Sequence, residues 1–396
     1  RQAFCTNPTC SASRSSLLTG LWPHNNGMTG LAHRGWRLND YGQHIIHTLH
    51  REGYHSTLCG VQHVANYRDG NAPDIIGYKE HLGEGPEEWD ERAAAWLNDS
   101  PPEPFFLSVG FVETHRDFPE PACDSPETDP RYARPPGPIP VTPETCRDMA
   151  AFNTLARTLD AKMGAVLNAL DEAGLAENTL VVCTTDHGIA FPRMKCNLHD
   201  SGIGIMLMLR GPGIPAGQRV HGMASHIDLF PTLCEYLEIE PPGWLQGVSL
   251  MPLLRGEAQE VREELFAEVN YHAAYEPMRC VRTPRWKYIR RFEERSGPVL
   301  PNCDDSPTKE LWLENGWADR EPPVEALYDL IFDPHEAHNL AGDAEHEGVL
   351  AEMRARLDTW MRETDDPLLE GSVPAPEGAR VNDPDDMSAN DPVEPA

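Results

Sequence analysis

The sequence predicts an α/β fold built on a mainly parallel sheet that is covered by helices on both faces. Short apolar runs alternate along the chain with longer segments of helical periodicity, a pattern typical of strands joined by crossover helices. Each run is followed at once by polar or turn-forming residues, as expected where a buried strand ends. The four predicted strands are 55–60, 105–112, 179–185 and 205–209.

The residues that follow these strands are candidates for a shared site. His63 comes soon after the first strand and His115 after the second. Asp186 and His187 follow the third, and Arg210 opens a turn after the fourth. Parallel strands end at the same edge of a sheet, and ligands of α/β proteins bind there. We therefore expect these side chains to lie together.

One long helix is predicted before the third strand. Its apolar residues recur at every third or fourth position and form a single stripe, and Gly174 is expected to end it. Before this helix, residues 119–143 are rich in Pro, Asp and Glu and predict a surface excursion. The stripe consists of Leu155, Leu159, Met163, Leu167 and Leu170.

A change of pattern near Gly256 divides the chain into three predicted parts. Residues 1–256 form the large α/β domain, whose first strand is expected to be missing because the chain begins at Arg1. Residues 257–364 form a smaller α+β domain with short, mixed strands and a terminal helix. Residues 365–396 are acidic and rich in proline, and we expect a disordered tail there.

The composition excludes some classes of partner. The 396 residues carry a formal net charge of −30, which repels nucleic-acid phosphates and anionic membranes, so we expect neither as a partner. No apolar run is long enough to span a bilayer. The 10 cysteines show no C-x-x-C pair and no zinc-finger spacing. An anionic substrate would need a local positive site.

The stretch CSASRSSLLTG, Cys10 to Gly20, is predicted to form a short helix with Cys10 and Arg14 at its N-terminal end. A helix N-terminus offers free N–H groups and partial positive charge, which suit a tetrahedral oxyanion. Arg14 adds a planar set of donors beside the cysteine. A buried cysteine near a capped helix would give the same pattern, so these residues alone leave both interpretations open.

Together with later segments, this stretch resembles the type I sulfatase signature Cys-x-Pro-Ser-Arg-x-x-x-Leu-Thr-Gly. Two further segments, PHNNGMTGL (23–31) and GVQHV (60–64), resemble the sulfamidase-like, heparan N-sulfatase branch. The resemblance implies an alkaline phosphatase-like fold with a smaller C-terminal α+β domain. The other matching segments, in family order, are TTDHG (184–188), DLFPTL (228–233), GVSLMPLLRG (247–256) and ALYDLIFDPHEAHNLA (326–341).

The resemblance also implies a chemistry. Cys10 would be oxidised to formylglycine by a formylglycine-generating enzyme. One hydroxyl of the hydrated aldehyde would attack sulfur and displace an alcohol or amine, and the second would allow sulfate to leave. A hard divalent cation, calcium with magnesium as the alternative, would bind the oxygen atoms.

Roles for individual residues follow from the same resemblance. Asp186 and His187 would be metal ligands, with Arg14 supporting the modified side chain. His63 would hydrogen-bond the aldehyde hydrate and accept its proton. His115 would contact sulfate and protonate the leaving group, and Lys195 would lie on the same side.

The chain departs from the family pattern at several positions. Ala12 replaces a proline in the segment read by the oxidising enzyme, and Val61 replaces a lysine that would contact sulfate. Arg116 and His33 are the candidates to replace that positive charge. By the same resemblance, the Asp-Asp pair that supplies two metal carboxylates in the family would lie upstream of Arg1. With Asp186 as the main remaining carboxylate, we expect weak metal binding and low activity.

The sequence therefore predicts a formylglycine-dependent sulfatase that acts on a sulfate ester or sulfamate, with a sugar as the expected carrier. Two alternatives remain open at this level. Sulfate and phosphate have similar size and shape, so a phosphomonoester or phosphonate hydrolase of the same superfamily fits the motifs. A catalytically silent homologue that binds sulfated glycans fits the departures at Ala12 and Val61.

Overall fold

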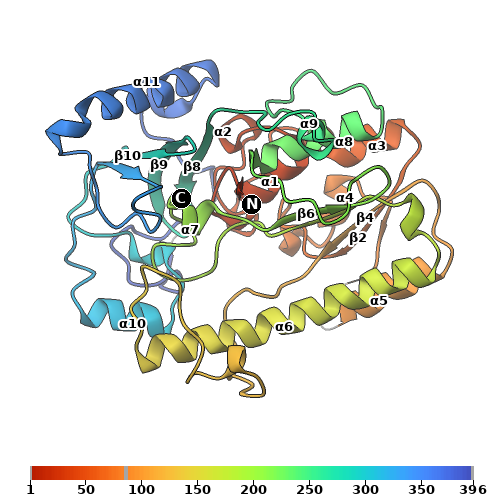
Figure 1. Cartoon of the computed structure of the whole chain (residues 1–396), viewed down its shortest axis with the longest axis horizontal. Coiled ribbons are helices and arrows are strands. Elements are labelled where there is room, and N and C mark those ends of the chain that lie inside the picture. The colour runs from red at the N-terminus through yellow and green to blue at the C-terminus, as the bar shows by residue number, and fades with distance from the viewer. Residues whose placement is uncertain (1, 84–87, 394–396) are drawn as a thin grey trace.

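The computed structural model describes residues 2–83 and 88–393, which form an α/β half and a half built on an antiparallel sheet (Figure 1). The helices are α1 (Cys10–Thr19), α2 (Pro23–Asn26), α3 (Ile45–Arg51), α4 (Ala72–Ile76), α5 (Trp89–Asn98), α6 (Pro143–Glu172), α7 (Asp200–Ile203), α8 (Leu229–Tyr236), α9 (Met251–Leu254), α10 (Pro307–Glu314) and α11 (Glu347–Glu363). The strands are β1 (Gln2–Phe4), β2 (His55–Gly60), β3 (Glu80–His81), β4 (Phe105–Gly110), β5 (Val181–Thr184), β6 (Leu207–Arg210), β7 (Met223–Ser225), β8 (Leu265–Tyr271), β9 (Tyr275–Arg282), β10 (Trp286–Arg291) and β11 (Glu325–Asp329).

The parallel strands of the α/β half confirm the predicted fold class. Strand β2 pairs in parallel with both β3 and β4, and Gly60 lies opposite Gly110 at the carboxyl ends of β2 and β4. Strand β1 pairs in parallel with β7, so the chain enters the fold through a short strand that the sequence pattern did not reveal. The segments that carry His63 and His115 leave the sheet at one edge.

Strand β6 runs against this pattern, and the prediction that Arg210 joins the shared edge is wrong. It pairs antiparallel with β5, so Arg210 lies opposite Val181 at the amino end of β5. There Arg210 forms an ion pair with Asp171 near the end of α6. An apolar run marks a buried strand but carries no information about its direction.

Helix α6 extends the predicted helix at its N-terminal end. It begins at Pro143, after the side-chain oxygen of Thr142 caps the first turn. It ends before Gly174, which adopts the left-handed φ of 72°. The helix runs along one side of the molecule (Figure 1), where it packs against α5 of the α/β half and against α10 of the C-terminal half.

The C-terminal sheet has the order β11-β10-β9-β8 and is antiparallel throughout. Its side chains alternate between two faces. On one face Leu265 packs in a core with Phe4 and Leu198 of the α/β half. On the other face Phe266 packs with Trp360 of α11, with the two rings stacked at 4.9 Å. The two halves therefore share a hydrophobic core.

The C-terminal segment differs from the expected disordered tail. Residues 365–393 follow a defined path, with Ala379 and Asn382 almost fully buried. Asp366 pairs with the buried Arg279 of β9, and Arg34 donates to the Asn382 side chain at 2.8 Å. Composition predicts disorder because the segment has few apolar residues. Here polar anchors on distant parts of the chain hold it instead.

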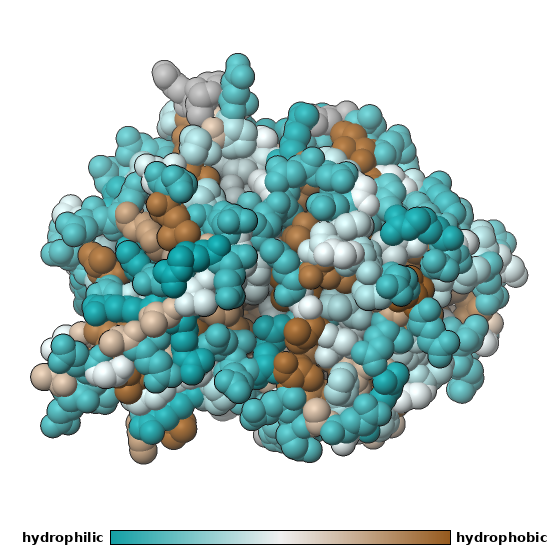
Figure 2. All heavy atoms as spheres, turned by 90° about the horizontal axis from the view of Figure 1, so that it is seen from above, coloured by the Kyte–Doolittle hydropathy of each residue, from teal (hydrophilic) through white to brown (hydrophobic). Residues whose placement is uncertain are grey.

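The surface is dominated by hydrophilic side chains. In the face shown in Figure 2, apolar residues occur as small patches separated by polar ones. Scattered patches of this size are ordinary for a protein surface. Among the described residues, no helix is both long enough and apolar enough to cross a membrane.

Candidate active site

Cys10 is the first residue of α1 and is almost fully buried. The preceding Thr9 is extended, with φ −127° and ψ 143°, and its hydroxyl donates to Asn7 Oδ1 at 2.7 Å instead of capping the helix. The helix ends at Gly20, which adopts the left-handed φ of 68°. Cys10 therefore sits at the positive end of a helix whose first turn has no side-chain cap.

The loop after β5 brings His187 against Cys10. The Nε2 atom of His187 lies 3.3 Å from Cys10 Sγ, and its Nδ1 donates to the carbonyl of Gly188 at 2.8 Å. Any Cβ on Gly188 would lie 1.9 Å from the carbonyl oxygen of Ser201, so only glycine allows the loop to pack this closely. The loop after β5, which the sequence places next to the candidate site, thus brings His187 to the cysteine.

The protonation states of this pair are coupled. Burial alone would raise the pKa of the Cys10 thiol, but His187 and His63 outweigh burial and hold this pKa well below its usual value. Burial would likewise lower the pKa of His187, yet the charges of Asp186 and Cys10 raise it to about 9. These two shifts favour a thiolate at the unmodified Cys10 and an imidazolium at His187.

Asp186 orients the cationic residues of the site. Its Oδ2 accepts from Arg14 Nε at 3.0 Å, and its Oδ1 accepts from the backbone N–H of His187 at 3.1 Å. Burial opposes ionisation, but His187 and Arg14 hold the pKa of Asp186 well below its usual range. Ser13, one turn into α1, donates to the Asp186 carbonyl and so fixes the loop to the helix.

Lys195 lies buried on another side of Cys10, with 5% of its surface exposed. Its Nζ donates to Asp304 Oδ2 at 2.9 Å and to Oδ1 at 3.2 Å. Burial would lower the pKa of Lys195, but Asp304 and Cys10 raise it above its usual value, so the ammonium stays charged. The next residue, Cys196, donates its N–H to the Pro8 carbonyl at 2.9 Å and holds this loop beside the start of α1.

The two remaining predicted residues lie on the outer side of the site. His63 adopts a left-handed φ of 60° after β2 and lies close enough to Cys10 to lower its pKa. His115 is exposed, and within the described part of the chain its ring bonds to the Arg116 carbonyl instead of to Cys10. Its charge acts on Asp304, so it borders the Lys195 side of the site.

Neither candidate replacement for the lysine missing at Val61 supplies a free charge. Arg116 is nearly buried in a two-pronged pair with Asp148, with both N–O distances at 2.8 Å. Burial and the neighbouring cations lower the pKa of His33 to about 3, so His33 is neutral at physiological pH. In this structure neither residue offers a free charge in place of the lysine, and a residue type alone does not reveal whether its charge is already compensated.

Several residues that support the site had no signal in the sequence. Asp304, the partner of Lys195, lies in a polar loop far along the chain and follows no strand. The ring of His226 forms hydrogen bonds with Ser13 Oγ at 3.1 Å and with Thr184 Oγ1 at 3.0 Å. Burial lowers the pKa of His226 to about 4, so it is neutral and positions α1 against β5.

Among the described His, Cys, Asp and Glu side chains, the group at Cys10 offers one carboxylate to a calcium ion. Cys10, Asp186 and His187 place their ligand atoms within 4.8 Å of one another, which offers sulfur, carboxylate and imidazole. Calcium takes roughly six to eight oxygen ligands. Asp186 is the one carboxylate of this group, and Arg14 already occupies one of its oxygens. The predicted role of Asp186 and His187 as calcium ligands therefore lacks the oxygen atoms it needs.

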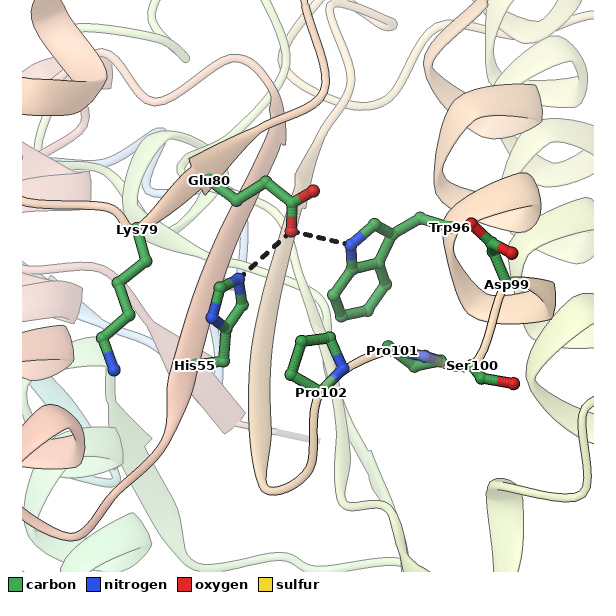
Figure 3. Close-up of a pocket in the computed structure, with 8 residues that line it drawn as sticks. All are labelled: His55, Lys79, Glu80, Trp96, Asp99, Ser100, Pro101 and Pro102. Carbon is green, nitrogen blue, oxygen red and sulfur yellow. Dashed lines mark hydrogen bonds and ion pairs between the residues drawn. The ribbon is translucent and has the colours of Figure 1, made fainter.

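A surface hollow lies where β2 begins, at the other end of that strand from His63. This pocket of about 450 Å³ is lined by His55, Glu80 and Trp96 (Figure 3). Glu80 Oε2 already accepts from His55 Nε2 at 3.1 Å and from Trp96 Nε1 at 2.9 Å. These polar groups satisfy one another, which distinguishes the pocket from the cluster around Cys10.

Comparisons with known proteins match most of the chain. The sulfatase family model matches residues 1–239, and the model described as N-sulphoglucosamine sulphohydrolase, C-terminal, matches residues 190–311. Human N-sulphoglucosamine sulphohydrolase is 30% identical, over 96% of this chain and 85% of its own length.

Solved structures show the same fold. A chain from Bacteroides thetaiotaomicron superposes with a TM-score of 0.71 at 23% identity, over 98% of this chain and 91% of that one. The phosphonate monoester hydrolase of Agrobacterium radiobacter superposes with a TM-score of 0.67 at 20% identity, over 92% and 88%. The family match over more than half of the chain and the likeness to the human enzyme lead to one conclusion: this chain belongs to the sulfatase family of hydrolases.

Proposed function

We propose that this chain hydrolyses a sulfate ester or sulfamate of a sugar through a formylglycine made from Cys10 by a formylglycine-generating enzyme. One observation carries the proposal. The side chain of Cys10 lies at the positive end of α1, 3.3 Å from His187, with the charges of Arg14 and Lys195 around the same group of residues. A dianionic sulfate group needs positive charge of this kind, which the chain as a whole, at −30, does not offer.

The surroundings of Cys10 suit a hydrated aldehyde. His187 and His63 both reach the side chain at position 10 and offer ring nitrogens to oxygen atoms there. When present, the hydrated aldehyde supplies one hydroxyl that displaces the alcohol or amine from sulfur and a second that lets sulfate leave. The segment is held by α1, so the reacting side chain is fixed by secondary structure.

The other residues stabilise charge and move protons. The N–H groups at the start of α1 and the ammonium of Lys195 face the sulfuryl oxygens and stabilise the negative charge on them. His63 accepts a proton from the side chain at position 10. His115, on the outer side, donates a proton to the leaving oxygen or nitrogen. Asp186 holds the Arg14 guanidinium and the His187 loop in place.

The likeness to human N-sulphoglucosamine sulphohydrolase supports a sugar that carries an N-sulfate as the first substrate to test. Glucosamine N-sulfate, glucosamine O-sulfates and matched aryl sulfate and aryl phosphate esters should be compared with purified protein, with Cys10→Ala as the blank. We expect sulfate release from a sulfated sugar that the blank does not show.

Two results would replace the proposal. A preference for aryl phosphates or phosphonates would favour a phosphonate monoester hydrolase, in line with the fold shared with the Agrobacterium enzyme. An unmodified Cys10 thiol in protein from its native host, with binding but no turnover of sulfated sugars, would favour a silent glycan-binding homologue. The proposal assigns no step to calcium, because Asp186 is the one carboxylate that the group at Cys10 offers within the described part of the chain.

A further inference from the structure

A group of cationic residues borders the outer side of the site. The His33 ring stacks on the His63 ring, with centroids 5.4 Å apart and 12° between the planes. The centroid of the Tyr67 ring lies 6.1 Å from that of the His33 ring, and Tyr67 is 55% exposed. Arg34 follows His33, and Arg68 follows Tyr67 with its guanidinium 5.7 Å from the Tyr67 ring. The contacts lead outward from the reacting position to two arginines.

A third arginine reaches this rim from the C-terminal segment. The backbone N–H of Arg380 donates to the Arg34 carbonyl at 2.8 Å, and Arg34 Nη1 donates back to the Arg380 carbonyl at 3.2 Å. Arg34 also bonds to Asn382 Oδ1 at 2.8 Å and to the Ala389 carbonyl at 3.0 Å. The segment that composition predicts to be disordered therefore supplies part of the wall beside the site.

These three arginines have no acidic partner among the side chains that the structure describes. The hydrogen bonds of Arg34 all go to neutral oxygen atoms. Burial lowers the pKa of Arg34, and the nearby charges of Arg380 and Arg68 lower it further. Cations that repel one another in this way gain stability when an anion binds between them.

Three acidic residues of the same segment bond to other groups. Asp385 pairs with Arg295, and Asp386 accepts from the side chain of Asn382. Asp391 accepts from the backbone N–H groups of Met387 and Ser388. In a chain of net charge −30, a group of arginines without a described acidic partner, next to His33 and His63, is the kind of local positive site that an anionic ligand needs.

We propose that Arg68, Arg380 and Arg34, with the exposed ring of Tyr67, form a subsite for a second acidic group on the sugar unit next to the one that carries the scissile sulfate. The substrate would then be an acidic oligosaccharide. Guanidinium groups bind carboxylates and sulfates through paired N–H donors, and the Tyr67 ring offers a flat surface to the sugar. This subsite rests on the proposed function at Cys10.

Binding of sugars to the Cys10→Ala protein, which cannot turn them over, tests the subsite. Calorimetry would compare a disaccharide of N-sulphoglucosamine and a hexuronate with its carboxyl-reduced form. A third ligand, with a sulfate in place of the carboxylate, identifies the preferred acidic group. Arg68→Gln and Arg380→Gln are the test variants, because Arg34 also anchors the C-terminal segment. Arg210→Gln, at the opposite edge of the sheet, is the matched control.

We expect the acidic disaccharides to bind more tightly than the reduced form, and each test variant to weaken them about five- to tenfold. Added salt should reduce the same preference. The Arg210→Gln control should bind like the parent. Equal binding of acidic and reduced forms, or an unchanged preference in both test variants, would overturn the subsite.

The two proposals can fail separately. The parent protein, without the Cys10→Ala change, could release sulfate while its preference for acidic disaccharides does not depend on Arg68 and Arg380. In that case the subsite is wrong and the sulfatase proposal stands. If no sulfated sugar is hydrolysed while arginine-dependent binding persists, the proposed activity is wrong and the anion-binding subsite stands.

Discussion

Two buried groups of this molecule look alike as residue types and differ in what they do. Cys10, Asp186 and His187 form one, and His24, Glu268 and Asp366 form the other, each with ligand atoms within 4.8 Å. Both combine a histidine with at least one carboxylate. They lie in different environments, one between the start of α1 and the loop after β5 and the other between α2, β8 and the segment after α11.

The second group is closed by an arginine. Arg279 is fully buried, its Nη2 donates to Asp366 Oδ1 at 2.9 Å, and its Nε lies 3.8 Å from Glu268 Oε2. Its Nη1 donates to the Val269 carbonyl at 3.0 Å and to Asn270 Oδ1 at 2.9 Å. The guanidinium thus occupies the place where a cation would bind.

The Cys10 group keeps its reactive atom available. Its arginine, Arg14, lies to one side and bonds to Asp186 through Nε. Cys10 Sγ faces the His187 ring and the positive end of α1. A buried acid–histidine cluster is thus structural where an arginine fills its centre, and a candidate for chemistry where its centre faces a helix N-terminus.

The largest difference between the groups should appear when Cys10 is changed. Cys10→Ala should lower turnover of a sulfated sugar by at least about 10⁴-fold, because it removes the reacting side chain. Steady-state kinetics would measure this loss. Cys234→Ala, a buried cysteine in a separate core cluster, should retain turnover, and a Cys10→Ala protein that keeps most of its activity would refute the assignment.

Arg279→Met should have the opposite profile, with a large loss of stability. It leaves Asp366 and Glu268 buried without their cation, and we expect a loss of about 3–5 kcal/mol in the free energy of unfolding. Urea titration would measure it. Arg210→Met removes an exposed ion pair and should cost roughly 0.5 kcal/mol or less. Equal losses of unfolding free energy in Arg279→Met and Arg210→Met would mean that the buried group contributes little to stability.

Lys195→Ala tests whether a paired cation at the active site still acts on the substrate. We expect kcat/KM to fall about 10²–10³-fold, because a buried charge beside the sulfuryl group is lost. The double variant Lys195→Ala/Asp304→Asn removes both members of the buried pair. Its free energy of unfolding should recover relative to Lys195→Ala alone, while kcat/KM should stay low. Recovery of rate in the double variant would show that Lys195 acts only by pairing with Asp304.

Asp366 gives the smallest effect, and it depends on pH. Burial would raise the pKa of Asp366, but Arg279 holds it below its usual value. Its ionised form therefore stabilises the folded protein above about pH 4, the ordinary value for an aspartate, and this contribution is lost as the pH falls through the folded pKa. Asp366→Asn should cost about 2 kcal/mol at pH 7. The difference from the parent in urea unfolding should shrink towards pH 3, and a constant difference would contradict this origin.

Much of the fold followed from local patterns. Apolar runs marked β2, β4, β5 and β6, and helical periodicity marked α6. The direction of β6 did not follow, because pairing depends on the path of the intervening chain. The course of residues 365–393 did not follow either, since it depends on partners such as Arg34 and Arg279 that lie far away in the sequence.

The candidate site was predicted in part. Cys10, Arg14, Asp186 and His187 occur in recognisable motifs, and the structure brings them together. Motifs did not reveal Asp304, because a lone aspartate in a polar loop resembles any other. They also could not show that Arg116 is already paired with Asp148. Such pairing depends on tertiary contacts that no short stretch of sequence encodes.

The most direct test of the central claim is a mass spectrum of the peptide that contains Cys10, taken from protein made together with a formylglycine-generating enzyme and assayed for sulfate release. We predict an aldehyde at position 10 and sulfate release that rises in proportion to the aldehyde fraction. Full activity in protein whose position 10 remains entirely a thiol would contradict the account.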